Sequence, residues 1–244
     1  MNLEQDINDA IGQETLSVIS EADKFNRWMY DEISPFLNGL VLELGSGIGN
    51  ISRMVLDDRF PTVLSDVNSS YLDQLKTAFS SYSNLRNVIT LDLQDPFFQT
   101  TNGDLQGKFD TIFLLNVIEH LKDDHAAVEN CKYMLKAGGT LILLAPAYHF
   151  LYCNLDKNLG HYRRYTSNTL AALLTQNNMQ LIEKKYFNLA GIAGWLLWGK
   201  LLGKQQLKAG GMRIFNKGVP IFRLADKMVH RKIGLSAIVA GKKI

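Results

Sequence analysis

VLELGSGIGN, residues 41–50, decides the fold that we expect for this chain. An apolar run that suits a buried strand leads into three glycines, Gly45, Gly47 and Gly49, and then into a helical pattern. A strand–turn–helix unit of this kind lets the backbone approach a ligand, with the N–H groups of the helix start directed outward. The third glycine comes one position too early for the dinucleotide fingerprint G-x-G-x-x-G. Glu43, two positions before the first glycine, suits the ammonium of an amino-acid moiety better than a pyrophosphate.

Outward from this stretch, short apolar runs alternate with helical patterns. Each run has the length and β-branched content of a buried strand, and a turn signal follows it. This alternation predicts a parallel sheet with helices on both faces. Gly138 and Gly139 fit the C-cap turn between the last of these helices and the fifth strand. The expected strands are residues 40–45, 62–67, 87–93, 109–116 and 139–146, and the helices between them are 49–58, 69–81 and 118–135.

Three further segments complete the expected organisation. Residues 179–187 and 234–243 read as two more strands, and the alternating charges of the first indicate a position near the sheet edge. Between them lies a helical insertion of about 45 residues, long enough to suggest a function. Residues 4–36 read as two helices, which we expect to form a lid over the carboxyl edge of the sheet.

Composition places the chain among ordinary globular proteins. Its 244 residues are 46% hydrophobic and 20% charged, which suits a single domain, residues 1–244. The polar, acidic start lacks the basic and apolar segments of a secretory signal. Cys131 and Cys153 lie in unrelated contexts without metal-ligand spacing. We therefore expect a reduced, cytoplasmic protein.

The segment 43–49, E-L-G-S-G-I-G, resembles the first motif of the class I S-adenosylmethionine-dependent methyltransferases. Asp66 ends the second expected strand 21 positions after Gly45, where the family places an acidic partner of the ribose diol. Asp92 ends the third strand, where the family contacts the adenine amine. Either carboxylate can instead cap the following helix.

The resemblance implies an α/β fold, a Rossmann-like doubly wound seven-stranded sheet, mostly parallel with an antiparallel last strand. It also implies three parts: a helical lid over 1–38, a cofactor-binding core over 39–146, and an acceptor side over 147–244. The cofactor would be S-adenosyl-L-methionine and the product S-adenosyl-L-homocysteine. The residues that we expect to contact the cofactor are Glu43, Gly45, Ser46, Gly47, Gly49, Asp66, Val67, Asp92, Leu93, Asn116 and Val117.

The loop after the fifth strand is the expected acceptor side. Its GHYRRYT, residues 160–166, resembles a sequence found in a bacterial subset of these methyltransferases. A histidine can remove the proton of a hydroxyl acceptor, and we favour His161 over the two alternatives, His149 and His120. Arg163 and Arg164 suit a bidentate clamp on an anionic acceptor, or else an ion pair with Asp156 or the acidic N-terminal segment. The expected acceptor-binding residues are Tyr148, His149, Tyr162, Arg163 and Arg164.

A metal is not expected from the sequence. Some RNA 2′-O- and quinone-precursor O-methyltransferases carry E-x-x-E-H at the turn after the fourth strand and bind a divalent metal there. This chain has Asn116 at the place of the first carboxylate, before Glu119 and His120. Hard cations need several oxygen ligands, so the missing carboxylate argues against the site.

The insertion and the basic C-terminal part bear on partners. Residues 189–208 place Trp195, Trp198, Leu201 and Leu202 near one helical face and Lys200, Lys204 and Lys208 near another. This pattern suits contact with a membrane surface, a cover over a hydrophobic acceptor, a helix packed on the domain, or a homodimer interface. The apolar stretch within it is too short for a transmembrane span. Residues 199–244 carry eleven Lys and Arg against one acidic residue, a net charge of +10.

These observations together predict methyl transfer to a small-molecule acceptor, anionic or hydrophobic, at a hydroxyl or carboxylate oxygen. Two alternatives remain open: an RNA or protein methyltransferase that uses the basic C-terminal region, and an NAD(P)-dependent oxidoreductase. We do not expect nucleic acid to be a partner, because a block of positive charge does not by itself specify any partner.

Overall fold

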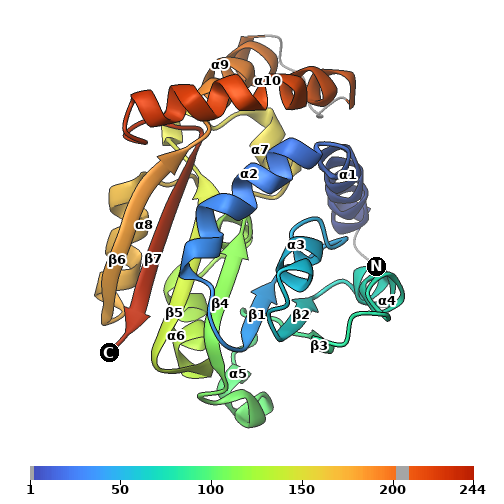
Figure 1. The fold of residues 1–244 in the computed structure, drawn as a ribbon, viewed down its shortest axis with the longest axis vertical. Coiled ribbons are helices and arrows are strands. Elements are labelled where there is room, and N and C mark those ends of the chain that lie inside the picture. The colour runs from blue at the N-terminus through green and yellow to red at the C-terminus, as the bar shows by residue number, and fades with distance from the viewer. Residues whose placement is uncertain (1–2, 202–208) are drawn as a thin grey trace.

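Seven strands form one sheet in the order β3-β2-β1-β4-β5-β7-β6 in the computed structural model, which describes residues 3–201 and 209–244 (Figure 1). The first five strands pair in parallel, whereas β7 runs antiparallel between β5 and β6. The predicted doubly wound α/β fold, with its antiparallel last strand, is confirmed. The strands are β1 Val41–Leu44, β2 Thr62–Asp66, β3 Leu85–Thr90, β4 Phe109–Leu115, β5 Leu135–Pro146, β6 Met179–Phe187 and β7 Ser236–Lys243.

Helices cover both faces of the sheet, because its central strands are apolar on both sides (Figure 1). On one face, Val128 of α6 and Leu170 of α8 share a core with Ile112 of β4. On the other face, Trp28 of α2 and Val55 of α3 pack in a core with strand residues. The longer helices are α1 Leu3–Ser20, α2 Asp23–Ile33, α3 Ser52–Asp57, α4 Ser69–Ala78, α6 Asp124–Met134, α8 Ser167–Gln176, α9 Leu189–Trp195 and α10 Ala209–Met228, and the short elements are α5 Phe98–Thr101, α7 Asn154–Asn158, η1 Ser34–Phe36, η2 Gly103–Leu105, η3 Ile118–His120, η4 His149–Leu151 and η5 Leu196–Leu201.

The helix predicted over residues 118–135 is divided in two. A single 3₁₀ turn, η3, ends at His120, and α6 begins only at Asp124. Asp123 has extended backbone, and its side chain accepts a hydrogen bond from the N–H of Ala126. This N-cap starts a new helix and leaves the residues of η3 at the carboxyl end of β4.

The prediction of a helix C-cap at Gly138 and Gly139 is wrong. β5 begins at Leu135, directly after α6, and both glycines lie inside it. On β4, Phe109 pairs with Leu135 of β5, whereas Thr111 pairs with Thr140. The register between β4 and β5 therefore shifts at this point. Gly138, with a φ of +74°, supplies the left-handed backbone that this irregularity needs.

The two N-terminal helices, which the sequence predicts to form a lid, lie at different places on the sheet. α1 reaches the glycine loop at the carboxyl edge, where Asn50 Nδ2 donates to the carbonyl of Leu16. α2 instead lies on the face of the sheet, where Trp28, Tyr30 and Ile33 are fully buried (Figure 1). Burial of three large side chains makes α2 a core helix.

The described part of the insertion between β6 and β7 is helical, as predicted, and contains α9, the π-helical η5 and α10. Asp226 near the end of α10 accepts hydrogen bonds from the N–H groups of Asn188 and Leu189, which ties α10 to the start of α9. Within the described chain, no helix is long and apolar enough to cross a membrane. The amphipathic pattern expected over 189–208 falls partly outside the described residues and side chains, namely at Trp198, Leu201, Leu202, Lys204 and Lys208.

Candidate active site

The glycine loop after β1 adopts a backbone that requires glycine. Gly45, Gly47 and Gly49 have φ values of +70°, +53° and +86°. A Cβ atom on Gly45 would lie 2.4 Å from Cγ2 of Val117, so β1 and the turn after β4 are in close contact. A Cβ atom on Gly47 would lie 3.0 Å from Cδ1 of Leu16, which shows that α1 covers the loop.

The end of β2 lies against this loop. The N–H of Gly47 donates to Oδ2 of Asp66 at 2.9 Å, and the N–H of Asn68 donates to Oδ1. Ser46 is buried, and its N–H donates to the carbonyl of Ser65 on β2. The Asp66 carboxylate therefore lies against the glycine loop.

Glu43 is a buried carboxyl group beneath the same loop. It is 4% exposed and accepts a hydrogen bond from Oγ of Ser52 at the start of α3. Burial raises the pKa of Glu43 to about 8, because the charged form loses its hydration. The group is therefore mostly uncharged at pH 7 in the free protein.

The remaining predicted cofactor residues differ in accessibility. Val67 is 64% exposed, directly after β2. Asp92 is exposed, and its Oδ1 accepts from the N–H of Gln94 in a turn, so it caps a turn and no helix. Leu93 lies in the core, which leaves only its backbone to contact a cofactor. Asn116 has a left-handed backbone, with a φ of +55°, and an exposed side chain.

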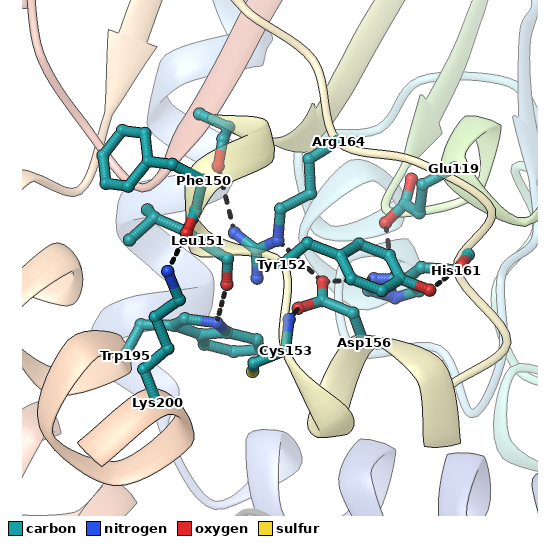
Figure 2. Close-up of polar contacts among 11 residues, drawn as sticks. Glu119, Phe150, Leu151, Tyr152, Cys153, Asp156, His161, Arg164, Trp195 and Lys200 are labelled. Atoms are coloured by element: carbon teal, nitrogen blue, oxygen red, sulfur yellow. Dashed lines mark hydrogen bonds and ion pairs between the residues drawn. The ribbon is translucent and has the colours of Figure 1, made fainter. Parts of the chain in front are cut away.

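The acceptor loop places His161 in a buried network (Figure 2). Nδ1 of His161 lies 2.9 Å from Oδ1 of Asp156, and the same oxygen accepts from Nε of Arg164 at 2.7 Å. The other oxygen of Asp156 accepts from the N–H of Cys153. Tyr152 Oη donates to the carbonyl of His161. Asp156 therefore fixes the orientation of the His161 ring, and Nε2 points away from Asp156.

Nε2 of His161 faces the turn after β4. It lies 4.0 Å from Oε1 of Glu119, and the ring of His120 meets that of His161 edge to face, with centroids 4.6 Å apart. Glu119 is fully buried, and burial raises its pKa to about 7. Burial, together with the neighbouring His161, lowers the pKa of His120 to about 4. Two imidazoles and one carboxyl group thus meet in a poorly hydrated site.

The two arginines of the loop are both engaged. Arg164 is buried, pairs with Asp156, donates to the carbonyl of Ala147 and stacks on Trp195 at 4.5 Å. Arg163 pairs with Asp124 at 2.8 Å. Both arginines therefore form ion pairs. The pair between Arg164 and Asp156 is one of those that the sequence suggested.

The side chains of the other expected acceptor residues lie outside the His161 network. Tyr148 stacks on Tyr186, with ring centroids 5.1 Å apart. His149 and Tyr162 are exposed. These three residues therefore border the loop surface and do not join the buried network.

Sequence reasoning did not assign a site role to Asp156 or Glu119. Asp156 precedes His161 by five residues, and Glu119 precedes it by 42, on a different element. For Asp156, the sequence did contain a signal, namely an acidic residue and a histidine within the same loop. The contact with Glu119 depends on the loop folding back onto η3, where the N–H of Tyr162 donates to the carbonyl of Glu119.

Comparison with known families matches the part of the chain that holds the glycine loop, but not the acceptor loop. The family model described as "Methyltransferase domain" matches residues 42–141. A probable polyketide synthase of Dictyostelium discoideum is 28% identical over 137 residues, which are 48% of this chain and 5% of that protein. A polyketide synthase–nonribosomal peptide synthetase of Aspergillus clavatus is 31% identical over 114 residues, 45% of this chain and 3% of that protein. The chain thus spans only a small part of the curated relatives that it matches.

Solved structures share the fold at low identity. A SAM-dependent methyltransferase from Archaeoglobus fulgidus has a TM-score of 0.58 at 13% identity, over 89% of this chain and 94% of that one. The carbon methyltransferase of CurJ has a TM-score of 0.56 at 14% identity, over 85% of this chain and 49% of that one. The [4+2]-cyclase SpnF has a TM-score of 0.59 at 14% identity, over 89% of this chain and 80% of that one. Because the fold also occurs in a cyclase, the reaction has to be argued from the site.

Proposed function

We propose that this chain carries a class I S-adenosylmethionine-dependent methyltransferase domain and that it methylates a hydroxyl oxygen of a small molecule. Methyl transfer from a sulfonium is an in-line displacement in which charge is neutralised. The protein's main contributions are therefore to orient the two reactants and to exclude water. An acceptor hydroxyl must also lose its proton, which calls for a base near the transferred methyl group.

The observation that carries the proposal is the pair formed by His161 and Asp156. The 2.9 Å contact at Nδ1 holds the imidazole in the tautomer whose Nε2 can accept a proton. The ring lies next to η3, at the carboxyl end of β4, the edge of the sheet at which ligands of doubly wound folds bind. His161 is thus the proposed base. The exposed His149 is the weaker candidate.

The ion pairs of the loop favour a hydroxyl over a carboxylate acceptor. Arg164 is held by Asp156, and Arg163 by Asp124, so each would have to leave a partner to clamp an anion. Tyr148, stacked between Tyr186 and Phe150, offers an aromatic border that suits an uncharged acceptor.

Methylation of an activated carbon is the second candidate. It is supported by the sequence similarity to polyketide synthases and by the fold shared with the CurJ carbon methyltransferase. A carbon between two carbonyl groups also needs a base, so the His161–Asp156 pair would serve this reaction as well.

An acceptor screen separates these candidates. Release of S-adenosyl-L-homocysteine is measured with phenols, aliphatic alcohols, carboxylic acids and β-dicarbonyl compounds, and mass spectrometry identifies the methylated atom. We expect O-methyl ethers as products, and C-methyl products would replace the first candidate by the second. Binding of NAD(H) in place of S-adenosyl-L-homocysteine would point to an oxidoreductase, and salt-sensitive RNA binding to a nucleic-acid substrate.

Substitution tests the assigned base. His161→Ala is expected to lower kcat by ~10²–10⁴ with little change in the affinity for S-adenosyl-L-homocysteine. His149→Ala is the matched control, because that histidine is exposed and lies outside the network. A His161→Ala enzyme with unchanged kcat, or one that loses stability and cofactor binding together, would remove His161 from the catalytic role.

A further inference from the structure

Three side chains that can ligate a metal converge behind the acceptor loop. Glu119, His120 and His161 each offer one ligand atom, and these atoms lie within 4.8 Å of one another. Two of the residues come from η3, and the third comes from the loop after β5. We propose that these residues hold a divalent cation of the first transition row, such as Zn²⁺.

The strongest argument is the state of Glu119. Its side chain is fully buried, and within the described part of the chain neither carboxylate oxygen has a hydrogen-bond partner. Buried carboxylates are normally hydrogen-bonded, paired with a cation or bound to a metal. Oε1 points toward Nε2 of His161 at 4.0 Å, which is too long for a hydrogen bond (Figure 2). A cation between the two groups would satisfy both of them.

The surroundings of His161 match those of a metal ligand. Asp156 occupies Nδ1, so the lone pair of the neutral ring lies on Nε2, the atom that faces Glu119. A carboxylate that orients a histidine in this way is the usual outer partner of a metal-bound imidazole. Asp156 is itself held by Arg164 and by the N–H of Cys153, so the arrangement is built and buried (Figure 2).

Distances and ligand types indicate the class of metal. Bonds of about 2.1 Å place adjacent ligand atoms roughly 3–3.5 Å apart, so the present 4.0 Å between Glu119 and His161 needs only a small contraction. Two imidazoles with one carboxylate suit Zn²⁺ and its neighbours, whereas Mg²⁺ and Ca²⁺ prefer oxygen. The missing carboxylate at Asn116 therefore does not exclude a metal, because His161 supplies the third ligand from a distant part of the chain.

This inference rests on the proposed function and refines it. With the cation bound, His161 is a ligand and no longer the base; the cation would lower the pKa of a coordinated acceptor hydroxyl, and the proton would pass to water. Binding of the cation can nevertheless be measured without any acceptor, so the two proposals can fail separately.

The test uses the full chain after treatment with a chelator, titrated with Zn²⁺ by calorimetry. We expect one Zn²⁺ per chain, a rise in Tm on binding, and, with Co²⁺, the visible absorption of a site with nitrogen ligands. Glu119→Gln is expected to weaken Zn²⁺ binding at least tenfold while the metal-free variant is as stable as the wild type, because the substitution removes an unpaired buried carboxylate. Asp156→Asn is expected to weaken binding ~10–100-fold.

His149→Ala and His125→Ala are the controls, because both lie outside the cluster. The proposal is overturned if the wild type takes up no stoichiometric Zn²⁺, or if either control loses as much binding as Glu119→Gln. Full methyl transfer by the metal-free enzyme would also overturn it while leaving the proposed function intact. Zn²⁺ binding at the cluster without any methyl transfer would support the cation and remove the proposed function.

A separate surface carries a second inference. α10 lies across one end of the molecule (Figure 1). Its inner face packs on the domain through Val219, and its outer face shows four large apolar side chains at helical spacing. The exposed fractions of these side chains are 75% for Ile214, 72% for Ile221, 59% for Leu224 and 73% for Met228.

The charges around this stripe indicate its partner. Lys217 lies within it, Lys227 and Lys232 are exposed nearby, and the one acidic residue of α10, Asp226, is buried. An apolar stripe with basic neighbours and no exposed acidic group on the helix suits the surface of an anionic lipid bilayer. We infer that α10 is a membrane-contacting helix.

Sedimentation with vesicles tests this surface. The full chain is expected to bind vesicles of phosphatidylglycerol and phosphatidylcholine in equal parts, less so at high salt, and not to bind pure phosphatidylcholine. The double variant Ile221→Ser, Leu224→Ser is expected to lose most of the bound fraction, and Ile182→Ser, exposed on β6, is the control. The inference is overturned if the chain does not bind the anionic vesicles. It is also overturned if the wild type is a dimer and the double variant, but not the control, is a monomer.

Discussion

Binding of the cofactor is expected to release a proton from Glu43. The pKa of this buried carboxyl group is about 8, so about nine-tenths of the groups are protonated at pH 7 in the free protein. The ammonium of S-adenosyl-L-homocysteine would stabilise the carboxylate and lower that pKa by at least ~2 units. Binding at pH 7 would then release about 0.8–0.9 proton, and the affinity would rise with pH, by up to about tenfold per pH unit, between the lowered pKa and pH 8.

Calorimetry measures this proton directly. The binding enthalpy of S-adenosyl-L-homocysteine is determined at pH 7 in buffers that differ in ionisation enthalpy, and the slope gives the number of protons released. Glu43→Gln is expected to abolish the release, because an amide does not titrate, and to weaken binding by about 1.5–3 kcal/mol through loss of a charged partner. Asp73→Asn, at an exposed carboxylate on α4, is the control.

Two results would refute the reasoning. If the wild type shows the same enthalpy in all buffers, Glu43 does not change its protonation on binding. If Glu43→Gln still releases the proton, another group is responsible, and the ammonium does not lie against this carboxyl group.

Three further predictions follow from the same loop. Gly45→Ala is expected to lower the free energy of unfolding by about 1–3 kcal/mol in urea titrations, because a Cβ at this position conflicts with the φ of +70° and with Val117. An unchanged unfolding midpoint would contradict this. Asp66→Ala is expected to weaken S-adenosyl-L-homocysteine binding by roughly 1–3 kcal/mol, measured by calorimetry, and unchanged affinity would remove Asp66 from the ribose site. The folded-state pKa of Glu43, about 8, exceeds its ordinary value of 4.5, so this group's contribution to the free energy of unfolding falls as pH rises from 4.5 to 8. Glu43→Gln is expected to flatten that part of the stability–pH curve, and an equally steep curve in the variant would count against the assignment.

The local features of the cofactor half were readable from sequence. Each depends on residues close together in the chain: an apolar run forms a buried strand, and the glycines permit positive φ where the chain turns back. Because right-handed crossovers bring the carboxyl ends of parallel strands to one edge, Asp66 could be assigned to the glycine loop before any contact was seen. The structure places its carboxylate 2.9 Å from the N–H of Gly47.

Side-chain partners distant in sequence were decided only by the tertiary structure. Arg164 could pair with Asp156 or bind an acceptor, and burial of both side chains selected the ion pair, since neither charge tolerates the interior alone. α2 has the amphipathic pattern of a lid, but the exposed face of the sheet needed an apolar cover, and Trp28 and Tyr30 provided it. Likewise, Glu119 meets His161 only because the loop after β5 folds back onto η3. Local propensity determines which elements form, whereas competition for burial and for buried charge partners determines which side chains meet.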